Sequence, residues 1–110
     1  MDFASNNISM IIYKNPINMH RSFNGLLSLA FNELDLDLGE DIYVLFMNRD
    51  RNQFKILFFQ YGHATIFTMR LSGSIQADFT KMDAIDSSTF HNLIKTVKSR
   101  KHRLRHVLGE

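Results

Sequence analysis

The chain of 110 residues has no cysteine and only one proline, Pro16. Without cysteine it cannot form disulfides, thiolate metal sites or a thiol nucleophile, and a reducing cytoplasm is the compartment we expect. No apolar run approaches the roughly 20 residues that cross a bilayer. The opening stretch MDFASNNISMIIYK lacks the basic and apolar regions of a signal peptide. These absences predict a cytoplasmic protein with no membrane partner.

The residues that are present suit one small domain with a sizeable core, because 45% are hydrophobic and ten are Phe. The formal net charge of +2 is too small to indicate nucleic acid by itself. The distribution of charge is more informative than its sum. Acids cluster at Glu33, Asp35, Asp37, Glu40 and Asp41, and bases cluster at Lys95, Lys98, Arg100, Lys101, Arg103 and Arg105. A binding protein could use this polarity.

Hydrophobic periodicity predicts an α+β fold in a small single domain. Strands near residues 42–47, 53–61 and 64–71 form an antiparallel meander, with an N-terminal strand near 8–13 and one more short strand within 75–79. Helices are expected near 19–34 and 87–104, with Asn18 as the N-cap of the first and the run Asp86-Ser87-Ser88 capping the second. The domain would comprise residues 1–97, followed by a basic C-terminal helix extension or tail at 98–110.

The apolar runs at 42–47 and 56–59 do not alternate as strands covered on one face should. We therefore expect one face of the sheet to be left exposed by the helices. Such a face would mark a protein partner or the seam of a homodimer.

Three blocks in order carry a resemblance to a known family: NMHRSFNGL, VLFMNRDRNQFKIL and MRLSGSI. They resemble the small accessory protein, often called TnpB or the Orf2-like protein, of insertion sequences of the IS66 type. That family carries D-M-R-K-G-x-D-G-L, then F-x-N-R-R-R-D-R-x-K-x-L, then K-R-L-x-x-G-x-F. The matching positions are Met19, Arg21, Gly25, Leu26, Phe46, Asn48, Arg49, Arg51, Lys55, Leu57, Arg70 and Leu71. Asn18 and Asn24 replace acids of the pattern, Asp50 interrupts its basic triplet, and the family's tryptophans are missing.

The resemblance implies a function in transposition, alongside a separate and larger transposase as partner. It brings no catalytic residues and no cofactor. We therefore expect a non-catalytic accessory protein rather than an enzyme.

Basic residues are the candidate binding groups, because Arg and Lys pair with phosphates. The candidates are Arg21, Arg49, Arg51, Lys55, Arg70, Lys98, Arg100, Lys101, Arg103 and Arg105. Our hypothesis is that they contact the backbone of transposon-end DNA without reading its sequence. The bland alternatives are a solvated turn at 48–52 and a solvated chain end. A second hypothesis is a pure protein–protein adaptor or homo-oligomeric module with no DNA contact, oriented by the acidic segment and the basic tail.

Metal and nucleophilic chemistry find little support. His102 and His106 have the spacing of two zinc ligands on a helix, but basic neighbours surround them and only Glu110 could add a third. The acidic stretch fails the calcium-loop pattern, and its carboxylates sit on a helix end and loop rather than on a rigid core. The sequence has no nucleophile elbow and no phosphate loop. We predict no metal, no cofactor and no catalytic residue.

Overall fold

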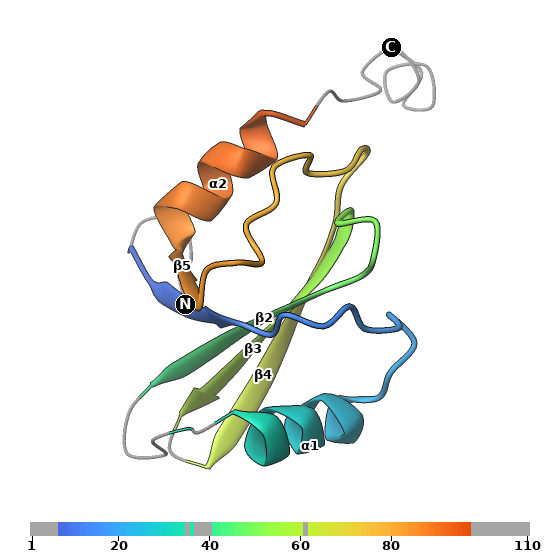
Figure 1. The fold of residues 1–110 in the computed structure, drawn as a ribbon. Coiled ribbons are helices and arrows are strands. Elements are labelled where there is room, and N and C mark those ends of the chain that lie inside the picture. The colour runs from blue at the N-terminus through green and yellow to red at the C-terminus, as the bar shows by residue number, and fades with distance from the viewer. Residues whose placement is uncertain (1–6, 35, 37–40, 61, 98–110) are drawn as a thin grey trace, which may run out of the picture.

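The fold is a five-stranded sheet with one helix on each face, seen in a computed structural model that describes residues 7–34, 36, 41–60 and 62–97 (Figure 1). The strand order is β4-β3-β2-β1-β5. The elements are β1 (Ser9–Ile12), α1 (Phe23–Glu33), β2 (Ile42–Met47), β3 (Gln53–Gln60), β4 (His63–Arg70), β5 (Ala84–Asp86) and α2 (Ser87–Lys95). The predicted α+β class is confirmed.

Strand directions show that the sheet is mixed. Strands β2, β3 and β4 form the predicted antiparallel meander. Strand β1 lies parallel to β2, with Ile11 opposite Val44, and antiparallel to β5, with Met10 opposite Ile85. Two parallel neighbours need a long crossover, and the segment carrying α1 supplies it. The N-terminal strand is therefore an interior strand.

Helices on both faces explain the unbroken apolar run of β2. Leu45 and Met47 belong to the core under α2, whereas Val44 and Phe46 belong to the core under α1. All four side chains are buried. Our inference that a helix layer on one side only would expose a face of this strand was wrong, because each face has its own helix.

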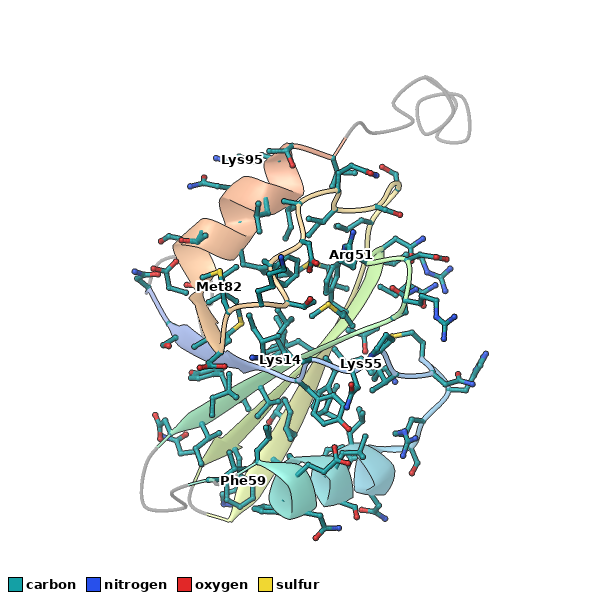
Figure 2. The ribbon with its side chains drawn as sticks, viewed as in Figure 1. Lys14, Arg51, Lys55, Phe59, Met82 and Lys95 are labelled. Atoms are coloured by element: carbon teal, nitrogen blue, oxygen red, sulfur yellow. The ribbon has the colours of Figure 1, made fainter. Side chains whose placement is uncertain are left out.

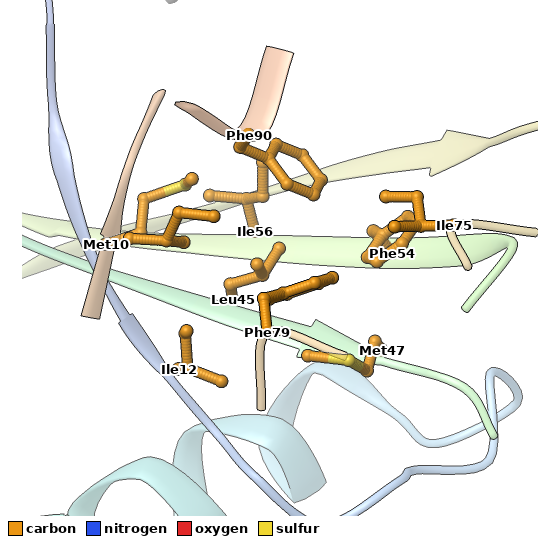
Figure 3. Packing of buried hydrophobic residues seen from close by; sticks show 10 residues of the cluster. Met10, Ile12, Leu45, Met47, Phe54, Ile56, Ile75, Phe79 and Phe90 are labelled. Carbon is orange, nitrogen blue, oxygen red and sulfur yellow. The ribbon is translucent and has the colours of Figure 1, made fainter. Parts of the chain in front are cut away.

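The core under α2 is shown in Figure 3. Phe90 of α2 packs edge-on against Phe54 of β3, with ring centroids 5.2 Å apart. Phe79 and Ile75 reach this core from the connection between β4 and β5. We expected a short strand within 75–79, but this segment is a loop in which only Ile75 and Phe79 are buried, and the fifth strand is Ala84–Asp86.

The helix starts follow their capping side chains. Asp86 caps α2 as predicted, since the Thr89 N–H donates to its Oδ1 at 2.7 Å. Helix α1 begins at Phe23 and not near 19, because Ser22 is the N-cap and its Oγ accepts from the Gly25 N–H. The predicted cap Asn18 instead accepts from the His20 N–H in the preceding turn.

The end of α2 also differs from the prediction. Helix α2 ends at Lys95, with Thr96 as its C-cap. The predicted continuation over 98–104 falls outside the described residues. The remaining strand limits agree within a residue, and residue 61 is likewise not described.

Candidate functional site

The five predicted binding residues that the structure describes come from segments that meet at one end of the sheet (Figure 1). The turn from β2 to β3 and the last residues of β4 meet there. The chain beyond β1 runs on beside β2, because the Tyr13 N–H donates to the Leu45 carbonyl at 3.0 Å and the Ile17 N–H to that of Met47 at 2.9 Å. Residues 18–20 are thereby brought beside the turn.

The turn at 48–52 is organised by the side chain of Asn48. Its Oδ1 accepts from the backbone N–H groups of Asn52 and Gln53, both at 3.1 Å, and its Nδ2 donates to the Asn52 Oδ1 at 2.6 Å. A short amide side chain replaces backbone acceptors in this way at many turns. Asn48 is therefore a structural residue of the site.

Arg51 ties the turn to the loop at 71–76 (Figure 2). Its Nε donates to the Ile75 carbonyl at 3.0 Å and its Nη2 to the Gln76 carbonyl at 3.4 Å. The Ile75 N–H returns a bond to the Arg51 carbonyl at 3.0 Å. Arg51 also has a φ of 54°, the left-handed region that non-glycine residues rarely adopt. The Arg51 guanidinium thus links the turn at 48–52 to the loop at 71–76.

A concavity of about 460 Å³ opens beside the turn, on the face that α1 covers further along the strands. Lys55 lies opposite Thr68 in the sheet register, and Arg70 lies opposite Gln53. Lys55 and Arg70 are diagonal cross-strand neighbours, about 7–8 Å apart. The other described residues of the lining are Asn18, Met19, His20 and Asn48. Among the described residues, the lining contains three basic side chains and no carboxylate.

A larger concavity of about 810 Å³ adjoins the first. Arg70 and Gln53 line both hollows. The larger one is bounded by the loop at 71–74 and by Thr96 at the end of α2. The last described turn of α2 therefore reaches the same end of the domain.

Among the described residues no cation at this end forms an ion pair, although the charge of Arg51 helps to lower the pKa of Asp78. Among the described residues the structure records one ion pair, Lys14 to Asp83 at 2.7 Å, and it lies elsewhere. Arg49 is exposed in the turn, with Asp50 exposed next to it. Arg21 is also exposed, and its stem lies so close to Gly25 that an added Cβ there would be 2.9 Å from the Arg21 Cγ.

Two acids of the predicted acidic cluster, Glu33 and Asp41, are among the described residues. Glu33, at the end of α1, accepts a hydrogen bond from the Tyr13 hydroxyl, and burial together with this bond raises the pKa of Tyr13. Asp41 precedes β2 and accepts from Gln60 at 3.3 Å. Asp41 thus lies at the start of β2, whereas Lys55 and Arg70 lie toward the opposite end of the strands.

The site includes residues that the sequence did not single out. They are His20, Gln53 and Thr68, which all line the smaller concavity. The strand register could have placed Thr68 and Gln53 beside the basic residues. The position of His20 depends on the pairing of β1 with β2, which has no local signal. Of the predicted binding residues, Lys98, Arg100, Lys101, Arg103 and Arg105 lie outside the described part of the chain.

Two other kinds of site are absent from residues 7–34, 36, 41–60 and 62–97. No group of three or more His, Cys, Asp or Glu there is placed to hold a metal ion. No helix of that part is long and apolar enough to cross a bilayer.

The fold and the site define a small α+β domain with basic residues gathered at one end of its sheet. A sequence model of the family described as IS66 Orf2 like protein matches residues 8–103, and the chain belongs to that family. It is therefore an accessory protein of an insertion sequence, and the resemblance drawn from its three sequence blocks is confirmed. No curated protein sequence and no solved structure matches the chain.

Proposed function

We propose that the protein supports transposition, without catalysing a reaction, by holding transposon DNA through its phosphate backbone at the basic end of the sheet. It would do so in the cytoplasm, beside the transposase of the same element. One observation carries the proposal: Lys55, Arg70 and His20, from three separate segments, line one concavity in which the described residues include no carboxylate.

Gathering cations without acids is unfavourable for the folded protein alone. Two unit charges 7–8 Å apart repel by about 0.5 kcal/mol in water and by more near a protein surface. A bound phosphate attracts both cations and offsets this repulsion. Arg70 offers a planar fork for two phosphate oxygens and Lys55 a compact charge, so the pair suits a tetrahedral anion.

The more exposed cations would extend the contact along the backbone. Arg49 projects from the turn and Arg21 precedes α1 at the same end of the domain. The basic residues Lys98, Arg100, Lys101, Arg103 and Arg105 follow closely after Thr96, which lines the larger concavity. We propose that they add phosphate contacts. Arg51 would contribute mainly by fixing the turn, because its Nε and Nη2 are engaged with carbonyls.

The test is fluorescence anisotropy of the full chain with a labelled transposon-end duplex and a scrambled duplex over a salt series. Backbone contact predicts similar affinity for both, falling steeply with salt. Each phosphate contact contributes about 0.9 to the slope of log K against log salt. The double variant Arg49→Gln/Arg70→Gln should lower that slope by up to about 1.8. Lys14→Gln is the matched control, since Asp83 already neutralises Lys14.

Two results would contradict the proposal: no binding at low salt, or an unchanged slope in the double variant. Persistent capture of the transposase at high salt, without DNA binding, would instead favour the pure protein–protein adaptor.

A further inference from the structure

Strand β4 forms an edge of the sheet, and among the described residues only β3 pairs with it. It is eight residues long, and the stretch from Ala64 to Met69 carries no charge. Proteins usually shorten, charge or cover such an edge, because its free backbone groups template pairing with another strand. The opposite edge follows that rule: β5 has three residues and begins beside the Lys14–Asp83 ion pair.

The register shows which backbone groups of β4 face outward. Leu71 donates its N–H to the Asn52 carbonyl at 2.7 Å, which makes Asn52 and Leu71 a hydrogen-bonded pair. Hydrogen-bonded pairs alternate along an antiparallel ladder. Positions 63, 65, 67 and 69 therefore bond to β3. The N–H and carbonyl groups of Ala64, Ile66, Thr68 and Arg70 point away from the sheet.

The side chains next to this edge are apolar on the face that α2 covers. Phe67 is 37% exposed in the middle of β4. Met69, two residues on, lines a groove of about 410 Å³ against Phe90 and Ile94 of α2. The edge of β4 thus offers backbone N–H and carbonyl groups that point outward, with apolar side chains beside them. Such an edge suits a partner strand that carries apolar side chains at alternate positions.

We propose that β4 pairs antiparallel with β4 of a second copy of this chain, so that two sheets join into one. A second copy brings the same free ladder, and a two-fold axis makes the pairing self-complementary. Residues that lie directly opposite each other in a sheet have side chains on the same face. The two-fold axis keeps each face of one copy next to the same face of the other. An even-numbered residue must therefore lie opposite an even-numbered one, and an odd-numbered residue opposite an odd-numbered one. Centring the axis on Phe67 satisfies this rule and places the two Phe67 rings opposite each other.

Charges also suit this register. Arg70 lies opposite Ala64 of the second copy, and Thr65 lies opposite Met69 of the second copy. Hydrogen-bonded pairs then fall at 64 with 70 and at 66 with 68, the positions whose backbone groups are free. No two like charges face each other along the joined edge. A partner strand rich in Lys or Arg would meet Arg70 and would fit less well.

This arrangement has a consequence for DNA that rests on the proposed function. Antiparallel strands point their basic ends in opposite directions, so a dimer would offer two separate backbone-binding ends. The dimer itself does not depend on DNA binding.

The experiment is sedimentation velocity on the full chain between about 1 and 100 µM, compared with the monomer mass of 12.8 kDa. Wild type should sediment at twice the monomer mass at the upper concentrations. Phe67→Lys and Phe67→Asp should each weaken self-association about tenfold or more, because like charges then lie opposite each other. An equimolar mixture of the two variants should restore a one-to-one dimer. Phe23→Lys is the control, since Phe23 is 43% exposed on α1.

A monomeric wild type throughout this range would overturn the proposal. So would Phe67 variants that stay dimeric while circular dichroism shows them folded, or a mixture that fails to pair. The DNA measurement is made on the same samples. Loss of DNA binding with an intact dimer would overturn only the proposed function, and DNA binding by a monomeric wild type would overturn only the dimer.

Discussion

Replacing Arg51 by Met should destabilise the domain far more than the same change at Arg49, two residues away in the same turn. The Nε bond of Arg51 to the Ile75 carbonyl measures 3.0 Å and is partly buried, whereas the Nη2 bond to the Gln76 carbonyl is long and exposed. A hydrogen bond from a charged donor contributes about 1.5–3 kcal/mol. Only the first bond has favourable geometry, so we expect a loss of about 2 kcal/mol.

The assay is equilibrium denaturation of Arg51→Met, Arg49→Met and wild type, followed by circular dichroism. A loss of about 2 kcal/mol corresponds to a fall of roughly 10 °C in Tm for a domain of this size. Arg49 has no recorded contact among the described residues, and its variant should stay within about 0.5 kcal/mol of wild type. Arg51→Lys keeps the charge and loses the fork, so it should resemble Arg51→Met.

The DNA assay should reverse the order of the two variants. Arg49→Met should weaken binding and lower the salt slope while leaving stability unchanged. Equal midpoints for Arg49→Met and Arg51→Met would refute the assignment of Arg51 as the residue that holds the loop. Wild-type stability in Arg51→Lys would show that charge alone matters there.

Three further changes test the packing and the caps. Ser22→Ala should lower the free energy of unfolding by about 1 kcal/mol through loss of the α1 cap. Ser28→Ala, in the middle of the same helix, should not destabilise the domain. Chemical denaturation of the two variants measures the difference. Phe90→Ala should cost about 3–5 kcal/mol because the ring is fully buried, and the exposed Phe23→Ala less than about 1 kcal/mol, measured in the same way. Hydrogen bonds from the Thr89 side chain and N–H lower the pKa of Asp86, so its stabilising effect is present above the ordinary pKa of about 3.9 and is lost as pH falls through the lower folded value. Asp86→Asn should therefore show a shallower loss of stability below about pH 4 in acid denaturation.

Local patterns in the sequence were sufficient to predict the meander and both helices. Apolar and β-branched runs bounded by short turns placed β2, β3 and β4 almost to the residue, and the capping residues at 86–88 placed the start of α2. The cap of α1 was misassigned because Asn18 and Ser22 both have capping side chains. Only the path of the chain beside β2 decides that Asn18 closes a turn and Ser22 begins the helix.

Long-range pairing was the part that the sequence could not supply. Nothing local indicates that β1 lies between β2 and β5, or that His20 comes to rest near Lys55. The same gap explains the wrong expectation of an exposed face on β2. A continuous apolar run is expected in a strand with a helix on one face and a protein partner on the other. It is equally expected in a strand with a helix on each face, and only the placement of α2 decides between the two. Arg51 was predicted as a binding residue from its charge, whereas its bonds to the loop carbonyls depend on tertiary structure.

The interior position of β1 also sets an order of events during synthesis. Its neighbouring strands are residues 42–47 and 84–86. β1 is synthesised before either of them, so it can complete its pairing only after both have been made. The meander can form earlier, since its turns are short and local contacts close quickly. The segment that carries His20 comes beside the turn only through the parallel pairing of β1 with β2. A nascent chain would therefore display the turn and its arginines well before the concavity beside them is complete.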